Sequence, residues 1–159
     1  MGKKKTANDY LHQLRMLKEA GMEYNRYVND SGNDQDLLLP LAERVENILH
    51  IINKHDRPIG NMLFFIMYDI ESNKVRYNVA KYLIKQGCTR IQKSVFLADL
   101  DTATYKEIRD ALTDIQALYD NHDSIVVCPV PTDVVRNMRV IGKDLNIDII
   151  THATNTLFF

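Results

Sequence analysis

The stretch that decides the fold is Met62-Leu63-Phe64-Phe65-Ile66-Met67-Tyr68-Asp69. Its first seven residues are uncharged, mostly apolar and rich in strand formers, as in a central strand that is covered on both faces of a sheet. The run ends at Asp69, the first charged residue after Arg57. We therefore predict a buried strand over residues 62–68 with a carboxylate at its end.

The segments that follow alternate between helical and strand patterns. Ser72 suits the cap of the first helix and Gly87 its end. The expected order is helix 72–87, one strand or a kinked pair over 89–100, helix 102–119, buried strand 124–128, and short strands 138–141 and 147–151. This order indicates an α+β fold of the ferredoxin-like kind, in which two helices cover one face of an antiparallel sheet.

The first 58 residues are interpreted as a helical extension that precedes this core. One helix is expected to follow Asn8 or Asp9 and to end at Gly21, and a second to run from about residue 36 to 53 with Pro40 in its first turn. Apolar side chains of the second helix step by three and four residues: Leu38, Leu41, Val45, Ile48 and Ile52. Such a stripe suits packing on the rest of the protein or on a partner. We therefore divide the chain into an extension, 1–58, and a core, 59–159.

Length and composition describe an ordinary globular chain. Its 159 residues are 45% apolar and 26% charged, which allows a sizeable core. No apolar run approaches the roughly 20 residues that cross a bilayer, and no secretory signal follows the basic start. We expect a cytoplasmic protein with no membrane partner. Cys88 and Cys128 predict neither a disulfide framework nor a metal site, and both are expected to be buried filler.

A block of positive charge lies between Glu71 and Asp99. It holds no acid and six cations: Lys74, Arg76, Lys81, Lys85, Arg90 and Lys93. The three lysines share a stripe of the predicted helix, because seven and eleven residues are near whole numbers of turns. Residues 99–123 have the opposite balance of charge, with seven acids and two cations. The block indicates either a phosphate-binding surface, which a dimer would double, or a solvated helix face.

Asp69 is the candidate metal ligand and, if the protein is a nuclease, the candidate catalytic residue. The predicted fold places its carboxylate at a sheet edge facing the next helix. Mg²⁺ prefers oxygen ligands, and two such carboxylates at a dimer axis could hold one ion and activate water for phosphodiester attack. Alternatively, Asp69 only accepts hydrogen bonds from the first amides of that helix. Glycine-rich phosphate loops, HExxH and CxxC motifs are absent from the sequence.

Three ordered segments resemble the small CRISPR-associated protein family Cas2. They correspond to its "YDI", "G-x-x-R-x-Q-x-S-V-F" and "D-S-(apolar strand)-P" patterns, with Arg76 in the helix after the first. In this chain they read Met67-Tyr68-Asp69-Ile70, Gly87-Cys88-Thr89-Arg90-Ile91-Gln92-Lys93-Ser94-Val95-Phe96, and Asp123-Ser124-Ile125-Val126-Val127-Cys128-Pro129-Val130. The resemblance covers about residues 62–159 and leaves the extension without a counterpart.

The resemblance implies a ferredoxin-like homodimer that bridges a larger CRISPR integrase subunit and helps to insert short duplexes into the CRISPR array. It also implies that Asp69 is the Mg²⁺ ligand of a nuclease activity ascribed to some members. Our leading interpretation is a spacer-acquisition subunit that holds double-stranded DNA on the six cations of the basic block. A stand-alone, Mg²⁺-dependent endonuclease acting on RNA or DNA, toxin-like or defensive, is the alternative. A protein-interaction module that uses the stripe of residues 38–52 is a third.

Overall fold

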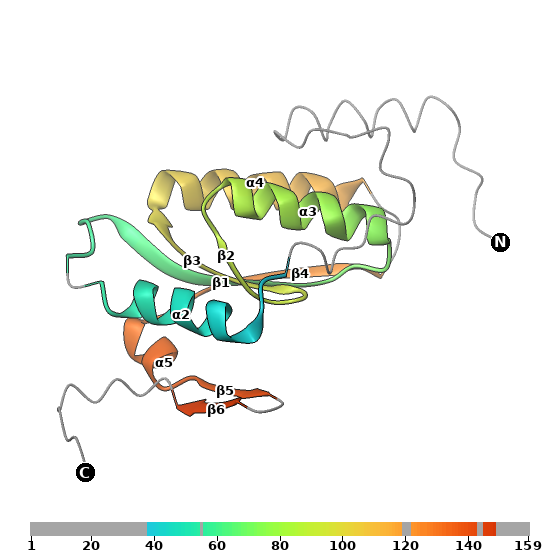
Figure 1. Ribbon diagram of the computed structural model, residues 1–159. Helices are drawn as coiled ribbons and strands as arrows, with labels where there is room; N and C mark the ends of the chain where they lie inside the picture. Colours follow the sequence, from blue (N-terminus) through green and yellow to red (C-terminus); the bar gives the residue numbers. More distant parts are fainter. Residues whose placement is uncertain (1–37, 55, 119–121, 143–144, 149–159) are drawn as a thin grey trace, which may run out of the picture.

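The computed structural model describes residues 38–54, 56–118, 122–142 and 145–148 (Figure 1). A four-stranded antiparallel sheet of order β2-β3-β1-β4 forms its centre, and β5 and β6 form a separate hairpin. The elements are α2 (Leu41–Ile52), β1 (Asn61–Asp69), α3 (Asn73–Lys85), β2 (Thr89–Gln92), β3 (Val95–Asp101), α4 (Thr102–Ala117), β4 (Ser124–Pro129), α5 (Thr132–Arg136), β5 (Arg139–Gly142) and β6 (Leu145–Asp148). None of the helices in these ranges is long and apolar enough to cross a membrane. The helix expected before Gly21 lies outside the described residues.

The predicted α+β, ferredoxin-like fold is confirmed. Figure 1 shows α3 and α4 on one side of the sheet and α2 and α5 on the other. We call the side under α3 and α4 the upper face and the opposite side the lower face. Strand β1 pairs with β3 and β4, and its side chains alternate between the faces. Phe64, Ile66 and Tyr68 join the upper core, whereas Leu63 joins the lower core.

Helices α3 and α4 begin at side-chain caps. The Ser72 hydroxyl accepts a hydrogen bond from the Val75 amide, at 3.5 Å. The Asp101 carboxylate accepts bonds from the amides of Ala103 and Thr104, and the hydrogen bonds from Thr104 lower the pKa of Asp101. After α3, Gly87 adopts a φ of +90°, a left-handed conformation that residues with a Cβ disfavour.

The structure decides between two alternatives for residues 89–100, which form two strands, β2 and β3, joined by a turn at residues 93–94. Other features differ from those predicted. Strand β4 is not buried: it lies at the edge of the sheet, and its side chains are exposed or half-buried. The expected strand 147–151 begins earlier, as β6 at Leu145, and the sequence reasoning missed the five-residue helix α5.

Helix α2 packs on the lower face of the sheet. Ile48 and Ile52 are 2% and 1% exposed and share a core cluster with strand residues Leu63, Ile91 and Leu97. The helix begins at Leu41 rather than near residue 36, because Pro40 is its extended N-cap (φ −50°, ψ 151°) instead of part of its first turn. The apolar stripe, apart from Leu38, therefore packs on the rest of the protein, and α2 shares a core with the strands. The division of the chain after residue 58 stays a prediction.

A partly buried ion pair holds the linker between α2 and β1 in place. Arg57 Nε lies 3.0 Å from Asp99 Oδ2, and the side chain of Asp99 is only 5% exposed. Arg57 Nη1 also donates to Thr132 Oγ1 at 2.7 Å. This arginine therefore ties the chain before β1 to both β3 and α5, on the same face as α2.

Replacing Ile48 with Ala tests whether α2 belongs to the core. The change removes buried methyl groups from the lower cluster and is expected to lower the free energy of unfolding by about 2–5 kcal/mol in urea denaturation. Leu39→Ala is the control, because Leu39 is 46% exposed just before the helix. It is expected to change stability by less than about 1 kcal/mol. Equal, small effects of both variants would contradict the packing of α2.

Candidate nucleic-acid interface and metal-binding carboxylate

Asp69 is exposed at the end of β1, opposite Ser124 of β4. Strand alternation puts it on the lower face, whereas its neighbours Tyr68 and Ile70 pack under α3 and α4. The prediction that it faces the next helix is therefore wrong. The alternative role as a helix cap is also wrong, because Ser72 caps α3. Within the described parts of the chain, no side chain forms a hydrogen bond or ion pair with the Asp69 carboxylate.

The loop after Asp69 is held in place by its neighbours. Asp123 Oδ1 accepts the Glu71 amide at 2.9 Å, and Gln116 Nε2 donates to the Asp123 carbonyl at 2.6 Å. From α3, Arg76 Nη1 donates to the Ile70 carbonyl at 3.3 Å. These bonds fix the end of β1 relative to the start of β4. The sequence reasoning missed this contribution of Asp123, although its "D-S" motif was the available signal.

A single copy offers an incomplete metal site. In the ranges that the structure describes, no three His, Cys, Asp or Glu side chains are grouped to hold an ion. Mg²⁺ requires near-octahedral oxygen coordination, which one carboxylate cannot supply. Asp69 fits such an ion only together with further oxygen ligands, from a second copy or from nucleic-acid phosphates. A bound Mg²⁺ stays a prediction.

The lysines of the basic block lie on α3 and on the turn after β2. Lys81 and Lys85 are exposed and Lys74, in the first turn of α3, is half-buried. Lys93 is exposed in the turn between β2 and β3. The Tyr68 amide donates to the Ser94 carbonyl at 3.0 Å, which places this turn at the Asp69 end of the sheet.

Arg90 does not belong to the exposed surface that the sequence predicted. It is 5% exposed, its Nε donates to the Lys93 carbonyl at 3.2 Å, and its guanidinium lies 5.6 Å from the centre of the Phe96 ring. Arg90 therefore stabilises the turn after β2 from a buried position. Arg76 is half-buried, and its guanidinium also donates to Asn73 Oδ1. Lys81, Lys85 and Lys93 are therefore the exposed cations of the block.

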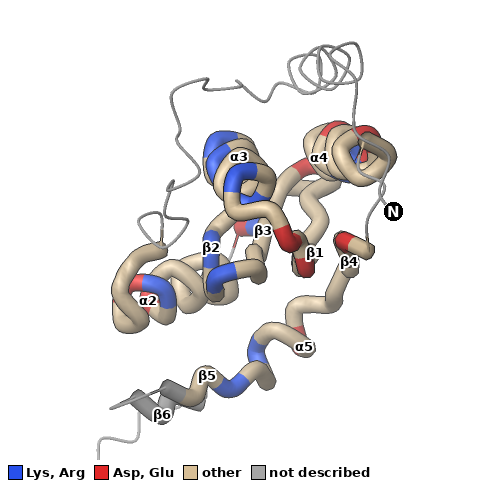
Figure 2. The backbone as a smooth tube through the Cα atoms, turned by 90° about the vertical axis from the view of Figure 1, so that its right-hand side faces the viewer, with Lys and Arg blue, Asp and Glu red and all other residues tan. Residues whose placement is uncertain are grey.

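Positive and negative charge occupy different sides of the molecule. Figure 2 shows Lys and Arg positions on α3 and along the β2 side, and Asp and Glu positions on α4, at the end of β1 and at the start of β4. On α4 the exposed acids Glu107, Asp110 and Asp114 outnumber Lys106 and Arg109. The α3 side therefore suits a polyanion better than the α4 side does.

An apolar area next to Asp69 is left uncovered by α2. Met67 and Val126 face each other across β1 and β4 and are 36% and 52% exposed. Both lie on the lower face, two residues before Asp69 and two after Ser124, respectively. We call Met67 and Val126 the open apolar pair.

The two cysteines differ in burial. Cys88 is buried, and burial raises the pKa of its thiol to about 12. The reactive thiolate is therefore scarce at neutral pH. Cys128 is half-buried in the edge strand β4. The prediction of buried filler is confirmed for Cys88.

Comparison with known proteins agrees with the motifs. The family model described as CRISPR associated protein Cas2 matches residues 62–138. The chain is 37% identical over 81 residues to the CRISPR-associated endoribonuclease Cas2 of Aeropyrum pernix, covering 50% of this chain and 85% of that protein. It is 21% identical over 111 residues to the CRISPR-associated endoribonuclease Cas2 of Methanocaldococcus jannaschii, covering 70% of this chain and 90% of that protein. With this fold, these motifs and these relatives, the chain belongs to the Cas2 family of CRISPR-associated proteins.

Proposed function

We propose that this CRISPR-associated protein acts in spacer acquisition, as a homodimer that holds double-stranded DNA and bridges the larger integrase subunit. The observation that carries the DNA-binding part is the lysine stripe of α3. Lys81 and Lys85 are exposed, and no acid occurs between Glu71 and Asp99. The bridging of the integrase is supported by family membership rather than by a surface of this chain.

The lysines suit phosphate binding without sequence readout. Ammonium groups on long, flexible stems bind phosphates as point charges, and such interactions position a duplex without distinguishing its bases. Each copy offers Lys74, Lys81, Lys85 and Lys93. Two copies would present eight lysines, enough for affinity that falls steeply with salt.

The open apolar pair supports the homodimer. Met67 and Val126 are exposed apolar side chains on the lower face of the sheet, and a second copy packed there would remove them from water. Asp69 and Ser124 border the pair on the same face. The same packing would bring two Asp69 carboxylates toward one axis and supply the second carboxylate that a single copy lacks.

Removing the α3 lysines tests the DNA surface. The variant Lys74→Gln/Lys81→Gln/Lys85→Gln is expected to bind a duplex more weakly. The slope of log K against log salt should shrink by about 0.9 for each phosphate that the variant no longer neutralises. Fluorescence anisotropy over a salt series measures both quantities. Lys106→Gln/Arg109→Gln on α4 is the control for removal of positive charge and should behave like the wild type. Unchanged affinity and slope in the α3 variant would exclude this surface.

Cross-linking tests the homodimer interface. In a Cys128→Ser background, Val126→Cys is expected to form a covalent dimer with a short bismaleimide, because two copies of residue 126 would lie near one axis. Ile84→Cys, on the exposed side of α3 at 41% exposure, is the matched control and should stay monomeric on denaturing gels. Cross-linking of both variants to the same extent, or of neither, would argue against packing through the open apolar pair.

A nuclease is the second candidate function. The exposed Asp69 carboxylate, with no side-chain partner among the described residues, is the observation that favours it, and both relatives are named endoribonucleases. A bound Mg²⁺ would neutralise phosphate charge and lower the pKa of water at the scissile bond. In that case Asp69 of each copy holds the ion, and the α3 lysines hold the strand beside it.

Cleavage assays distinguish the two candidates. Labelled single-stranded RNA and double-stranded DNA are incubated with the protein in Mg²⁺ or in chelator. A nuclease should lose activity in chelator and in Asp69→Ala, but keep it in Glu71→Ala, a control that removes an exposed neighbouring carboxylate. Cleavage that survives in Asp69→Ala would indicate a contaminant. Absence of cleavage alongside salt-dependent duplex binding would leave the DNA-holding role alone.

A further inference from the structure

We propose that Tyr77 and Asn78 of α3 donate hydrogen bonds to phosphates of the bound duplex and fix its position on the lysine stripe. This inference rests on the proposed function and adds uncharged contacts to the charged ones. Both residues lie in the second turn of α3, and both are half-buried.

The two residues occupy the gap between Lys74 and Lys81. These lysines are seven positions apart, which is about 10.5 Å along a helix axis. Tyr77 and Asn78 are each three or four positions from both lysines, and helix residues at these spacings are neighbours on the surface. A phosphate backbone that contacted both lysines would therefore pass Tyr77 and Asn78. The side chains of α3 that reach the core are others: Val75, Val79, Ala80, Tyr82 and Leu83.

The uncharged groups of these two side chains suit phosphates. A phenol has one O–H donor and a carboxamide has two N–H donors. Tyrosine and asparagine supply part of the phosphate contacts of DNA-binding proteins, and such contacts fix the register and orientation of a duplex without reading its bases. A half-buried tyrosine keeps its polar tip in water while its ring covers neighbouring side chains. The hydroxyl of Tyr77, more than its ring, is therefore the group offered to a ligand.

The donors of Tyr77 and Asn78 have no other use in the part of the chain that the structure describes. Neither side chain forms a hydrogen bond there, whereas Asn73, in the first turn of the same helix, accepts one from Arg76. Helix α3 contains no acid, so no carboxylate of its own competes with phosphate for these donors. Asn73 therefore serves the start of the helix, and Asn78 remains for a ligand.

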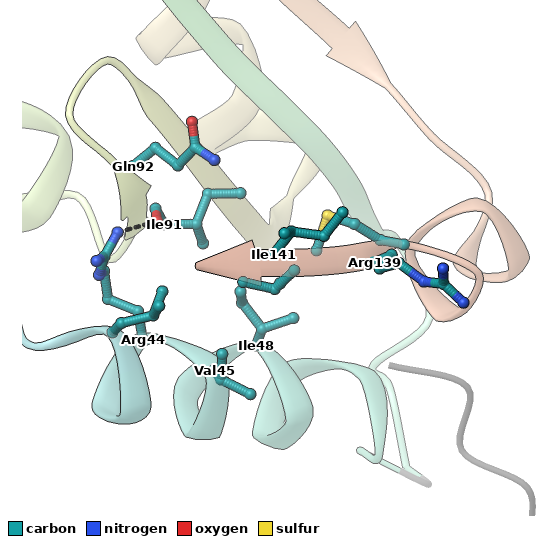
Figure 3. Close-up of a pocket in the computed structure, with 10 residues that line it drawn as sticks. Arg44, Val45, Ile48, Ile91, Gln92, Arg139 and Ile141 are labelled. Carbon is teal, nitrogen blue, oxygen red and sulfur yellow. Dashed lines mark hydrogen bonds between the residues drawn. The ribbon is translucent and has the colours of Figure 1, made fainter. Parts of the chain in front are cut away.

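The other side of β2 suits a phosphate backbone less well. A cavity of about 370 Å³ lies there between α2, β2 and β5, and most of its lining residues are apolar. Figure 3 shows Arg44 reaching from α2 to the Ile91 carbonyl, to which its Nη1 donates at 2.8 Å. This arginine therefore serves the packing of α2 on β2. Polar contacts that supplement the lysine stripe are thus to be sought on α3 itself.

The test compares the double variant Tyr77→Phe/Asn78→Ala with the wild type in duplex binding over a salt series. Loss of hydrogen bonds to phosphate should weaken binding about tenfold at each salt concentration. The slope of log K against log salt should keep its wild-type value, because counterions are released by cations and not by uncharged groups. Fluorescence anisotropy should therefore give a line parallel to that of the wild type.

Single variants separate the hydroxyl of Tyr77 from its ring. Tyr77→Phe and Tyr77→Ala should weaken duplex binding to a similar extent. Wild-type affinity of Tyr77→Phe, with weaker binding by Tyr77→Ala, would assign the contact to the ring and overturn the proposed hydrogen bond.

Thr113→Ala is the matched control on α4. It removes an exposed, uncharged polar side chain, whose hydroxyl donates to the Arg109 carbonyl of the same helix at 2.8 Å, and it should bind the duplex like the wild type. Phe and Ala are no weaker helix formers than Tyr and Asn, so α3 should stay intact in the double variant. Thermal unfolding of each variant verifies that it is folded.

The outcomes separate this inference from the proposed function. If the double variant binds like the wild type while the lysine triple variant lowers the slope, DNA binding stands and the uncharged contacts are wrong. If neither variant changes binding, the proposed DNA surface fails and this inference fails with it. A smaller slope in the double variant would show that it disturbs the lysines instead, and would also overturn the inference.

Discussion

Burial of β1 on both of its faces is the constraint on which the other features depend. Phe64 and Ile66 are 0% exposed under α3 and α4, and Leu63 is 4% exposed above α2. A strand held from both sides keeps its register with β3 and β4, and this register decides which face each of its residues occupies. A slip of one residue would move Asp69 under α3 and bury it. The exposed carboxylate is therefore a consequence of the apolar residues before it.

The extension shapes the surface that a second copy could use. Helix α2 covers the lower face beside β2 and β3, where Ile91 and Leu97 would otherwise face water. It leaves the β1–β4 end uncovered, with Met67, Val126 and Asp69. A partner on this face is thus directed to the end that carries the carboxylate. In physical terms, α2 both completes the core and limits the area left for association.

Local signals predicted much of the fold, and interactions between residues distant in sequence account for what was missed. The cap at Ser72, the turn at Gly87 and the apolar run of β1 act within a few residues, so the sequence shows them directly. The burial of Arg90 depends on the ring of Phe96 and the Lys93 carbonyl, which only the folded hairpin brings together. Likewise, β4 has the composition of a buried strand, but sheet order puts it at an edge. The face that Asp69 occupies was predictable, because alternate residues of a strand share a face and Asp69 is an even number of residues after Leu63.

The hydrogen bond from Arg44 to the Ile91 carbonyl bears on how the protein can assemble. An unpaired strand edge is a template for adding another chain, and a sheet with two such edges can grow without limit. Here α2 lies against β2, and Arg44 donates a hydrogen bond to the Ile91 carbonyl of that strand. On the described part of the chain, β2 and β4 are the two edge strands of the four-stranded sheet. The bond from Arg44 makes strand addition less favourable at β2 than at β4, and pairing through one edge alone gives a finite pair of sheets rather than a fibre.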